Sequence, residues 1–170
     1  MTLVPRIAVS ACLTGEKVRY DGDDRLSRAV LELDEQFELI PVCPEVAIGL
    51  GVPRQTIGLY QEGDAIRIRQ HEAPFLDVTD ELFEFGLSQA GQFFCGFILK
   101  ARSPSCGIDD AELRNEHGQV IGTGTGGFIR GISAAGADLP MINEEDLRET
   151  DKLQAFIADV QAFANNQGFD

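Results

Sequence analysis

Short apolar runs alternate along the chain with segments of helical periodicity. The run at residues 93–99, FFCGFIL, is the most strand-like, and its apolar character on both faces is typical of a central parallel strand. The run at residues 6–11, RIAVSA, also predicts a buried strand. Shorter strands are expected at residues 39–42, 65–68, 119–121 and 139–142.

Helical periodicity marks three longer segments. Residues 26–37 carry apolar side chains at helical spacing, and residues 75–90 do so ahead of Gly91, which suits a helix end. The tail at residues 144–166 predicts one long helix or two abutting helices, opened by Asn143 as an N-cap. Strand–helix alternation of this kind predicts an α/β fold with a mainly parallel, Rossmann-like sheet flanked by helices.

Length and composition indicate one domain. The chain has 170 residues, of which 44% are hydrophobic, so we expect a single core and a single domain over residues 1–170. No apolar run reaches the roughly 18 residues that a membrane span needs, and the N-terminus lacks the layout of a signal peptide. We therefore expect a cytoplasmic protein with no membrane partner.

The charge balance narrows the class of partner. Lys and Arg number 14 against 28 Asp and Glu, which gives a net charge of −14. A surface this acidic repels a phosphate backbone, so nucleic-acid binding is not expected. We expect a monomer that acts on a small molecule with little or no charge.

Three of the four cysteines follow predicted strands. Cys12 lies one residue beyond the first strand, Cys43 one residue beyond the second, and Cys106 in the loop after residues 93–99. Because open α/β sheets bind ligands at the carboxyl ends of their strands, we expect these three thiols to meet at one crevice. Cys95 lies inside an apolar strand and is expected to be a buried hydrophobic residue. Without a signal peptide, metal binding or catalysis is favoured over disulfides.

The residues alone leave two kinds of metal centre open. Tetrahedral zinc needs a fourth protein ligand or a water, and the two histidines, His71 and His117, lie in polar stretches. Soft thiolates also bind iron–sulfur clusters, and three cysteines would leave one iron of a [4Fe–4S] cube open to a substrate atom. The spacing of the cysteines does not separate these alternatives.

Three motifs of the chain resemble a known family. They are VSACLTGEKVRYDG at residues 9–22, CPEVAIGLGVPR at residues 43–54 and LKARSPSCG at residues 99–107. In order and spacing they are similar to the family catalogued as domain of unknown function 523 (DUF523), which includes the thiouracil desulfidases. The likeness extends from about residue 7 to residue 147. Longer relatives carry an additional C-terminal domain, so the resemblance implies a short, stand-alone form.

The resemblance implies a cofactor and a reaction. Cys12, Cys43 and Cys106 correspond to the cysteines that hold a [4Fe–4S] cluster in the family. The iron without a protein ligand binds the sulfur of a small thiolated base or nucleoside, and water replaces sulfide without electron transfer, converting 2-thiouracil to uracil. Glu45 and Ser103 correspond to residues beside the substrate. A carboxylate placed there can shuttle the protons of such a hydrolysis.

Other interpretations of the same residues stay open. The cysteines would also suit a zinc-dependent hydrolase, or a non-catalytic iron–sulfur sensor or binding protein. Arg19, Tyr20 and Asp21 form either a structural turn or a binding element, and Arg54 makes either a contact to an anionic ligand group or a surface ion pair. Residues 122–127 match the G-x-G-x-x-G pattern, but their place late in the chain favours a structural turn that borders the crevice over dinucleotide binding.

Overall fold

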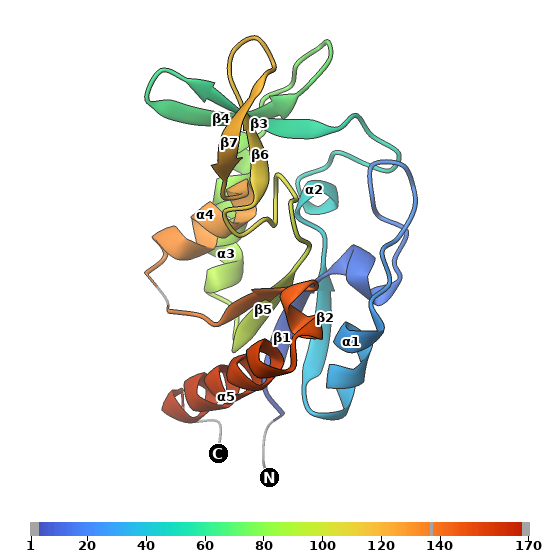
Figure 1. The fold of residues 1–170 in the computed structure, drawn as a ribbon, viewed down its shortest axis with the longest axis vertical. Coiled ribbons are helices and arrows are strands. Elements are labelled where there is room, and N and C mark those ends of the chain that lie inside the picture. The colour runs from blue at the N-terminus through green and yellow to red at the C-terminus, as the bar shows by residue number, and fades with distance from the viewer. Residues whose placement is uncertain (1–3, 137, 168–170) are drawn as a thin grey trace.

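Two four-stranded β-sheets form the framework of the computed structural model, which describes residues 4–136 and 138–167 (Figure 1). Sheet A has the strand order β2-β1-β5-β8, and every neighbouring pair in it is parallel. Its strands are β1 (Arg6–Ser10), β2 (Glu38–Val42), β5 (Gly96–Leu99) and β8 (Met141–Asn143). This sheet, covered by helices, confirms the predicted α/β fold.

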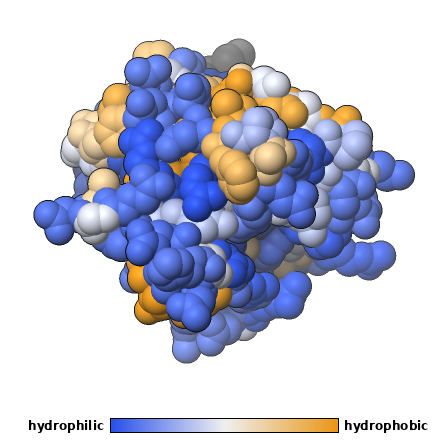
Figure 2. Space-filling view, turned by 90° about the horizontal axis from the view of Figure 1, so that it is seen from above, coloured by the Kyte–Doolittle hydropathy of each residue, from blue (hydrophilic) through white to orange (hydrophobic). Residues whose placement is uncertain are grey.

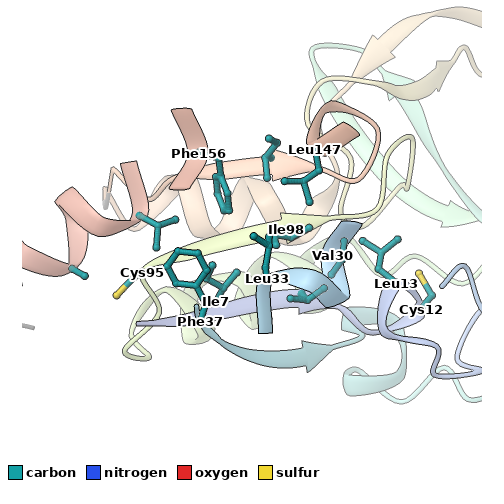
Figure 3. Packing of buried hydrophobic residues seen from close by; sticks show 14 residues of the cluster. Ile7, Cys12, Leu13, Val30, Leu33, Phe37, Cys95, Ile98, Leu147 and Phe156 are labelled. Carbon is teal, nitrogen blue, oxygen red and sulfur yellow. The ribbon is translucent and has the colours of Figure 1, made fainter. Parts of the chain in front are cut away.

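Alternation along the strands decides which helices cover each face of sheet A. Ile7 and Val9 of β1 point to the same face as Ile98 of β5, and they join a buried cluster with side chains of α1 (Arg28–Leu31) and α5 (Thr150–Asn166) (Figure 3). Full burial of one aliphatic side chain stabilises a fold by about 1.5–3 kcal/mol. This cluster therefore anchors the two central strands beneath α1 and α5.

The opposite face of sheet A is covered by α4 (Gly127–Ala134), which packs closely on α3 (Thr79–Ala90). Phe97 of β5 and Phe128 of α4 meet edge to face there, with ring centroids 6.1 Å apart. The two helices touch through glycines, since a Cβ on Gly131 would lie 2.1 Å from a backbone oxygen of α3. No residue larger than glycine fits at that crossing.

Sheet B lies beyond the carboxyl ends of β1 and β5, at the top of Figure 1. Its order is β4-β3-β6-β7, with β3 and β6 parallel and each outer strand antiparallel to its neighbour. Leu59, Ile68 and Leu82 form the core between this sheet and α3. Figure 2 shows this end of the molecule as a largely hydrophilic surface with a few hydrophobic patches. Its strands are β3 (Ile57–Glu62), β4 (Ala65–Gln70), β6 (Ala111–Arg114) and β7 (Val120–Gly124).

Two strands of sheet B were not predicted from the sequence. In β3 a glycine and three polar or amphipathic residues interrupt the apolar pattern, although its first four residues are buried. In β6 only Ala111 is fully buried, and the strand has four residues. Both strands are stabilised by pairing with partners distant in sequence, which local periodicity does not register.

Two helical predictions need correction at their starts. The segment expected as a helix from residue 75 becomes helical only at Thr79, because Phe75 has a φ of 55° and the Asp77 carboxylate accepts the Thr79 N–H at 3.0 Å. The C-terminal tail forms a short 3-10 helix, η3 (Asp146–Arg148), followed by α5. Asn143 is not the N-cap residue that the sequence predicted, because Glu145 precedes η3 and Glu149 precedes α5. Its Oδ1 instead accepts the backbone N–H groups of Glu145 at 3.0 Å and Asp146 at 2.8 Å in the turn before η3.

The expected strand at residues 93–99 is shorter than predicted. It begins at Gly96, and the side chain of Phe93 is 74% exposed, so the apolar run does not lie wholly in the sheet. The strand expected at residues 39–42 is β2, shifted by one residue at its start. The helix expected over residues 26–37 is shorter than predicted: α1 is a single turn, and the 3-10 helix η2 (Glu32–Glu35) follows it. No helix in the described ranges combines the length and apolarity that crossing a bilayer requires.

Candidate functional site

A cavity of about 390 Å³ lies where the carboxyl ends of β1, β2 and β5 face sheet B. The chain leaves β1 toward β2 on one side, whereas β5 and β8 lie on the other, so β1 and β5 flank the point at which the strand order reverses. Open α/β sheets bind ligands at that point. Cys12, Cys43 and Cys106 all line this cavity, as the sequence predicts.

Each of these cysteines is held by a short, constrained segment. Cys12 lies in the 3-10 helix η1 (Ala11–Thr14), which follows β1 directly. Cys43 precedes the one-turn helix α2 (Pro44–Ala47), where proline occupies the first position and presets the helical backbone. These local structures fix the two sulfurs relative to the ends of β1 and β2.

The Cys106 loop is fixed by a serine and by the start of α4. The Ser103 hydroxyl oxygen accepts the N–H groups of Ser105 at 3.1 Å and Cys106 at 3.0 Å. Backbone N–H groups at residues 126–128 donate to carbonyl oxygens at residues 104–107 at 2.9–3.1 Å. The amides of Gly126 and Gly127 are therefore used by the protein itself, which agrees with a structural role. Residues 122–124 lie in β7 rather than in a turn, and the cavity lining contains none of residues 122–127.

The three thiols influence one another; Cys12 and Cys106 are buried, and Cys43 is half-buried. Burial raises the pKa of Cys12, Cys43 and Cys106 above the ordinary thiol value. The positive charges of Arg19 and Lys100 oppose the rise of the pKa at Cys12. A side-chain hydrogen bond with Ser10 opposes it at Cys106. Thiols in such surroundings ionise readily only when a cation binds their sulfurs.

Cys95 lies away from this group. Its side chain is 0% exposed and packs in the hydrophobic cluster of sheet A. Figure 3 shows Cys95 and Cys12 at opposite ends of that cluster. The buried position agrees with the expectation that Cys95 is a core residue, and it places Cys95 outside the cavity lining.

Glu45 lies in α2, and both of its carboxylate oxygens have partners. Arg54 donates its Nε–H to one oxygen at 3.0 Å, and the Ser105 hydroxyl donates to the other at 2.9 Å. The side chains of Glu45 and Arg54 are only 14% and 6% exposed. Arg54 is therefore a partner of Glu45 in a buried ion pair, rather than the surface ion pair that the sequence left open.

Arg54 also joins distant loops of the site. Its Nη1 donates to the carbonyl oxygens of Val18 at 2.7 Å and Gly51 at 2.9 Å. The Val18 carbonyl in turn lies 3.9 Å from the Cys43 sulfur, within reach of that thiol as donor. One guanidinium thus connects the loop after Cys12, the segment after Cys43 and the carboxylate of Glu45.

The cavity is far more basic than the chain as a whole. Its lining includes five cationic side chains and one carboxylate, that of Glu45, in a protein of net charge −14. The cationic residues are Arg19, Arg25, Arg54, Lys100 and Arg102. A net charge cannot show such a cluster, because it averages over the whole chain.

Neither histidine belongs to the cavity. His117 lies in the turn between β6 and β7, and His71 contacts the Tyr60 hydroxyl on sheet B. Across residues 4–136 and 138–167, no three His, Cys, Asp or Glu side chains converge closely enough to hold a single metal ion.

Comparison with known proteins now adds to this geometry. The sequence family described as 2-thiouracil desulfurase matches residues 7–145. The chain belongs to this family. The matched range coincides closely with the range over which the three motifs resemble the DUF523 proteins, and it contains every residue placed at the cavity above.

Two individual proteins are similar to this chain over most of its length. A solved structure titled as the [4Fe–4S]-dependent thiouracil desulfidase TudS (DUF523Vcz) has a TM-score of 0.66 and 30% sequence identity, and the match covers 89% of this chain and 98% of that one. The uncharacterized protein YbbK of Bacillus subtilis (strain 168) is 28% identical over 153 residues, which covers 84% of this chain and 98% of YbbK. This member of the 2-thiouracil desulfurase family is accordingly a desulfidase-like enzyme.

Several residues of the site were not singled out from the sequence. Ser10 and Lys100 lie at the ends of β1 and β5, and the Ser10 hydroxyl accepts the Lys100 backbone N–H at 2.9 Å. Ser105 likewise was not singled out, and its hydroxyl donates to the Glu45 carboxylate at 2.9 Å. Lys100 and Ser105 belong to the motif LKARSPSCG, and Ser10 belongs to VSACLTGEKVRYDG, so the motifs themselves contained a signal for these residues.

Proposed function

We propose that this protein removes sulfur from a small thiolated pyrimidine, converting 2-thiouracil to uracil and sulfide with water, at a [4Fe–4S] cluster held by Cys12, Cys43 and Cys106. The observation that carries the proposal is the convergence of these three thiols on one cavity at the switch point of sheet A. Membership of the 2-thiouracil desulfurase family and the likeness to a [4Fe–4S]-dependent thiouracil desulfidase support it.

The residues present fit such a cluster. Thiolates are the preferred ligands of iron–sulfur clusters, and binding each sulfur to a different iron allows them to lie farther apart than around one ion. Three thiolates and the Glu45 carboxylate bring negative charge into a largely buried site, which is costly without cations. The iron core of a cluster is itself positively charged. Among the basic side chains that line the cavity, Arg54 pairs with Glu45, and Arg19 has no carboxylate partner among the described residues.

The cofactor has one chemical task in this proposal. When bound through three cysteines, the cluster supplies an iron without a protein ligand, a Lewis acid for the thiocarbonyl sulfur, so the hydrolysis needs no electron transfer. The remaining tasks, which are to position the base and to move protons, belong to side chains of the protein.

Glu45 is placed to accept a proton from the attacking water. Arg54 and Ser105 hydrogen-bond to its two oxygens and so fix the carboxylate at the cavity wall. A carboxylate held in one orientation can take the proton at one oxygen and return it to a ring nitrogen of the product. Arg54, joined to Glu45 and to two loops, acts in this proposal as a positioning residue.

Ser103 is placed to bind the substrate. Its oxygen accepts two backbone N–H groups, which leaves the hydroxyl hydrogen free to donate to a heteroatom of the pyrimidine. Ser103 lines the cavity beside Cys106. The cavity volume of about 390 Å³ lies within the range of small-molecule sites, which run from about 300 to 1,000 Å³.

Anaerobic reconstitution tests the proposal as a whole. The purified protein, given iron and sulfide without oxygen, is expected to bind about four irons per chain and to absorb broadly in the visible range. The loaded protein is then expected to consume 2-thiouracil, measured by loss of its ultraviolet band together with release of sulfide. A loaded protein without turnover would support the sensor function instead, and uptake of zinc in place of iron would support the hydrolase.

Single cysteine variants test the ligand set. Cys12→Ser, Cys43→Ser and Cys106→Ser are each expected to lose both the cluster and activity, because two thiolates retain a cube poorly. Cys95→Ala is the matched control, and we expect normal iron content with a loss of stability of about 1 kcal/mol from the small cavity. A Cys95 variant without iron, or an active variant at one of the other three positions, would contradict the assignment.

Three broader predictions from the sequence also belong to this proposal. We propose that the whole chain acts as one domain, as a monomer and in the cytoplasm. The close packing of α3 on both α4 and sheet B supports a shared core for the two sheets. Analytical ultracentrifugation of the loaded protein measures the oligomeric state directly.

A further inference from the structure

The basic side chains at the cavity differ in their partners. Four of the five form ion pairs with carboxylates: Arg25 with Asp21, Arg54 with Glu45, Lys100 with Glu144, and Arg102 with Glu145. Arg19 forms no ion pair with any carboxylate of the residues that the structure describes. It is thus a cation at the cavity whose charge the protein does not compensate locally.

The Arg19 side chain also contains an unused donor. Its Nε is buried and has no hydrogen-bond partner within the described part of the protein. A buried donor without a partner destabilises the folded protein, so such groups usually have an acceptor in the functional state. Arg19 and Cys12 line the same cavity, and the loop that carries Arg19 returns to Cys12, because the Arg25 N–H donates to the Cys12 carbonyl oxygen at 2.9 Å.

The backbone around Arg19 is fixed, so this placement is not a property of a loose loop. The Arg19 N–H donates to the Asp23 carbonyl at 3.2 Å, and the Gly22 N–H donates to the Arg19 carbonyl at 2.9 Å. Arg54 holds the residues on either side of Arg19, through the Val18 carbonyl and through its own N–H to the Tyr20 carbonyl. The guanidinium is further supported by the Tyr20 ring, 5.5 Å from its centroid.

We propose that Arg19 is a positioning residue that pairs with the Cys12 thiolate and stabilises the bound iron–sulfur cluster. This inference rests on the proposed function and adds a residue for which the sequence offered only a turn or an unspecified binding role. The bound thiolate supplies the acceptor that the buried Nε–H lacks and the negative charge that the guanidinium lacks. Arginine suits this task because it stays charged and directs its donors along fixed lines.

The other two cysteines have donors of a different kind. Backbone N–H groups of Glu45 and Val46, at the start of α2, lower the pKa of Cys43 against the effect of burial. The Ser10 hydroxyl serves Cys106. Arg54 adds a positive charge near Cys43, but that guanidinium is already paired with Glu45, whereas Arg19 has no carboxylate partner among the described residues. Outer partners of metal ligands commonly change metal affinity or activity by about 10–100-fold when they are removed.

The test compares cluster properties, measured apart from turnover. Wild type, Arg19→Gln and Arg19→Lys are reconstituted anaerobically, and the reduction potential of the cluster and its rate of iron loss to a chelator are recorded. Removing the cation disfavours the more negative reduced cluster, so Arg19→Gln is expected to lower the potential. We also expect iron loss about 10–100-fold faster. Arg19→Lys keeps the charge without Nε–H, so its potential is expected to lie nearer wild type, with faster iron loss.

Arg6→Gln is the matched control, because it removes the same charge at the other end of β1, from a partly exposed ion pair with Glu38. Its potential and iron loss are expected to equal those of wild type. Wild-type values in Arg19→Gln, or an equal shift in Arg6→Gln, would overturn the inference. Should Arg19→Gln fail to fold, unchanged iron loss in Arg19→Lys would overturn it. A wild type that takes up no cluster would instead count against the proposed function itself.

Discussion

Glu45 is a fixed carboxylate rather than a mobile loop acid. Its partners Arg54 and Ser105 come from segments 9 and 60 residues away along the chain. A base held by two donors loses little conformational entropy when the substrate arrives, which is the advantage of preorganised catalytic groups. At this scale the site depends on contacts between the motifs rather than within any one of them.

Replacing Glu45 with glutamine tests its role as the base. Glu45→Gln keeps the size of the side chain and its contact with Ser105 but removes the proton acceptor. We expect normal iron content, because no proposed cluster ligand changes, and turnover slower by about 10²–10⁴-fold, the usual contribution of general acid–base catalysis. Both quantities are measured on the same preparation.

Glu149→Gln is the control for that experiment, since Glu149 is an exposed acid paired only with Lys152. It is expected to match wild type in iron content and rate. Full turnover in Glu45→Gln would show that Glu45 is not the base and that Ser103 or solvent carries the protons. Loss of iron in Glu45→Gln would show that the carboxylate supports the cluster instead of the chemistry.

At the scale of elements, the contact between α4 and the Cys106 loop determines where the third sulfur lies. Gly126 is packed so tightly that an added Cβ would lie 2.4 Å from the carbonyl carbon and oxygen of Ser105. Gly122, in the same glycine-rich segment, has nothing within 4 Å of such an atom. A comparison of these two glycines therefore distinguishes the effect of tight packing at one position from the general effect of placing a larger residue in this segment.

Gly126→Ala is expected to destabilise the protein by about 1–3 kcal/mol, the usual cost of overpacking a tight contact. Because the displaced backbone carries Cys106, we also expect lower iron content after reconstitution. Urea unfolding and iron analysis measure the two effects. Gly122→Ala is the control and should change stability by less than about 0.5 kcal/mol. Equal effects of the two substitutions would show that the contact between α4 and the Cys106 loop does not determine the position of Cys106.

Sheet B contains a half-buried histidine, His71, and we expect its ionisation to make stability depend on pH. Burial, followed by the positive charge of Arg114, lowers the pKa of His71 below its ordinary value near 6.5. The unfolded chain then binds this proton more readily than the folded chain. The stabilisation is complete above about pH 6.5 and is lost as the pH falls toward the folded-state pKa.

We therefore expect the free energy of unfolding to fall between pH 7 and pH 5.5, and His71→Gln to lose part of that dependence. Urea titrations of wild type and variant at both pH values measure the difference. The comparison isolates His71, because carboxylates of the kind found beside it titrate mainly at lower pH. Identical pH dependence in the two proteins would show that His71 does not titrate in this range.

The elements of sheet A could be predicted from the sequence, whereas much of sheet B could not. Runs such as residues 6–10 are apolar on both faces and stand out locally. In contrast, β6 is a four-residue strand between β7, which follows it in a hairpin, and β3, whose paired residues lie more than 50 positions earlier in the chain. Motif resemblance located Cys12, Cys43 and Cys106, but Arg54 and Ser105 acquired their roles only through tertiary contacts with Glu45.

At the scale of the whole molecule, the cavity lies between two sheets that are packed against different helices. Sheet A is closed on one face by α5 and on the other by α4, and sheet B has its own core on α3 (Figure 1). Between them, the cavity wall consists largely of short helices and loops that follow β1, β2 and β5. Segments of this kind, rich in polar contacts, usually open more readily than the cores beside them.

A cluster bound by Cys12, Cys43 and Cys106 would connect three of these segments, so its removal should loosen them selectively. We expect the loaded protein to unfold at a higher temperature than the same protein stripped by a chelator, because a ligand bound only to the folded state stabilises it by about 3–4 kcal/mol when present far above its dissociation constant. Removal of the cluster by the chelator should also raise the rate of amide hydrogen exchange in residues 11–25, 43–54 and 100–107, whereas the rate in α5 should stay unchanged.

Helix α5 is the internal control, since it packs on sheet A away from the cavity lining. Equal loss of protection in α5 and in the cysteine segments would mean that the cluster supports the entire fold, and unchanged exchange everywhere would mean that it does not bridge these loops.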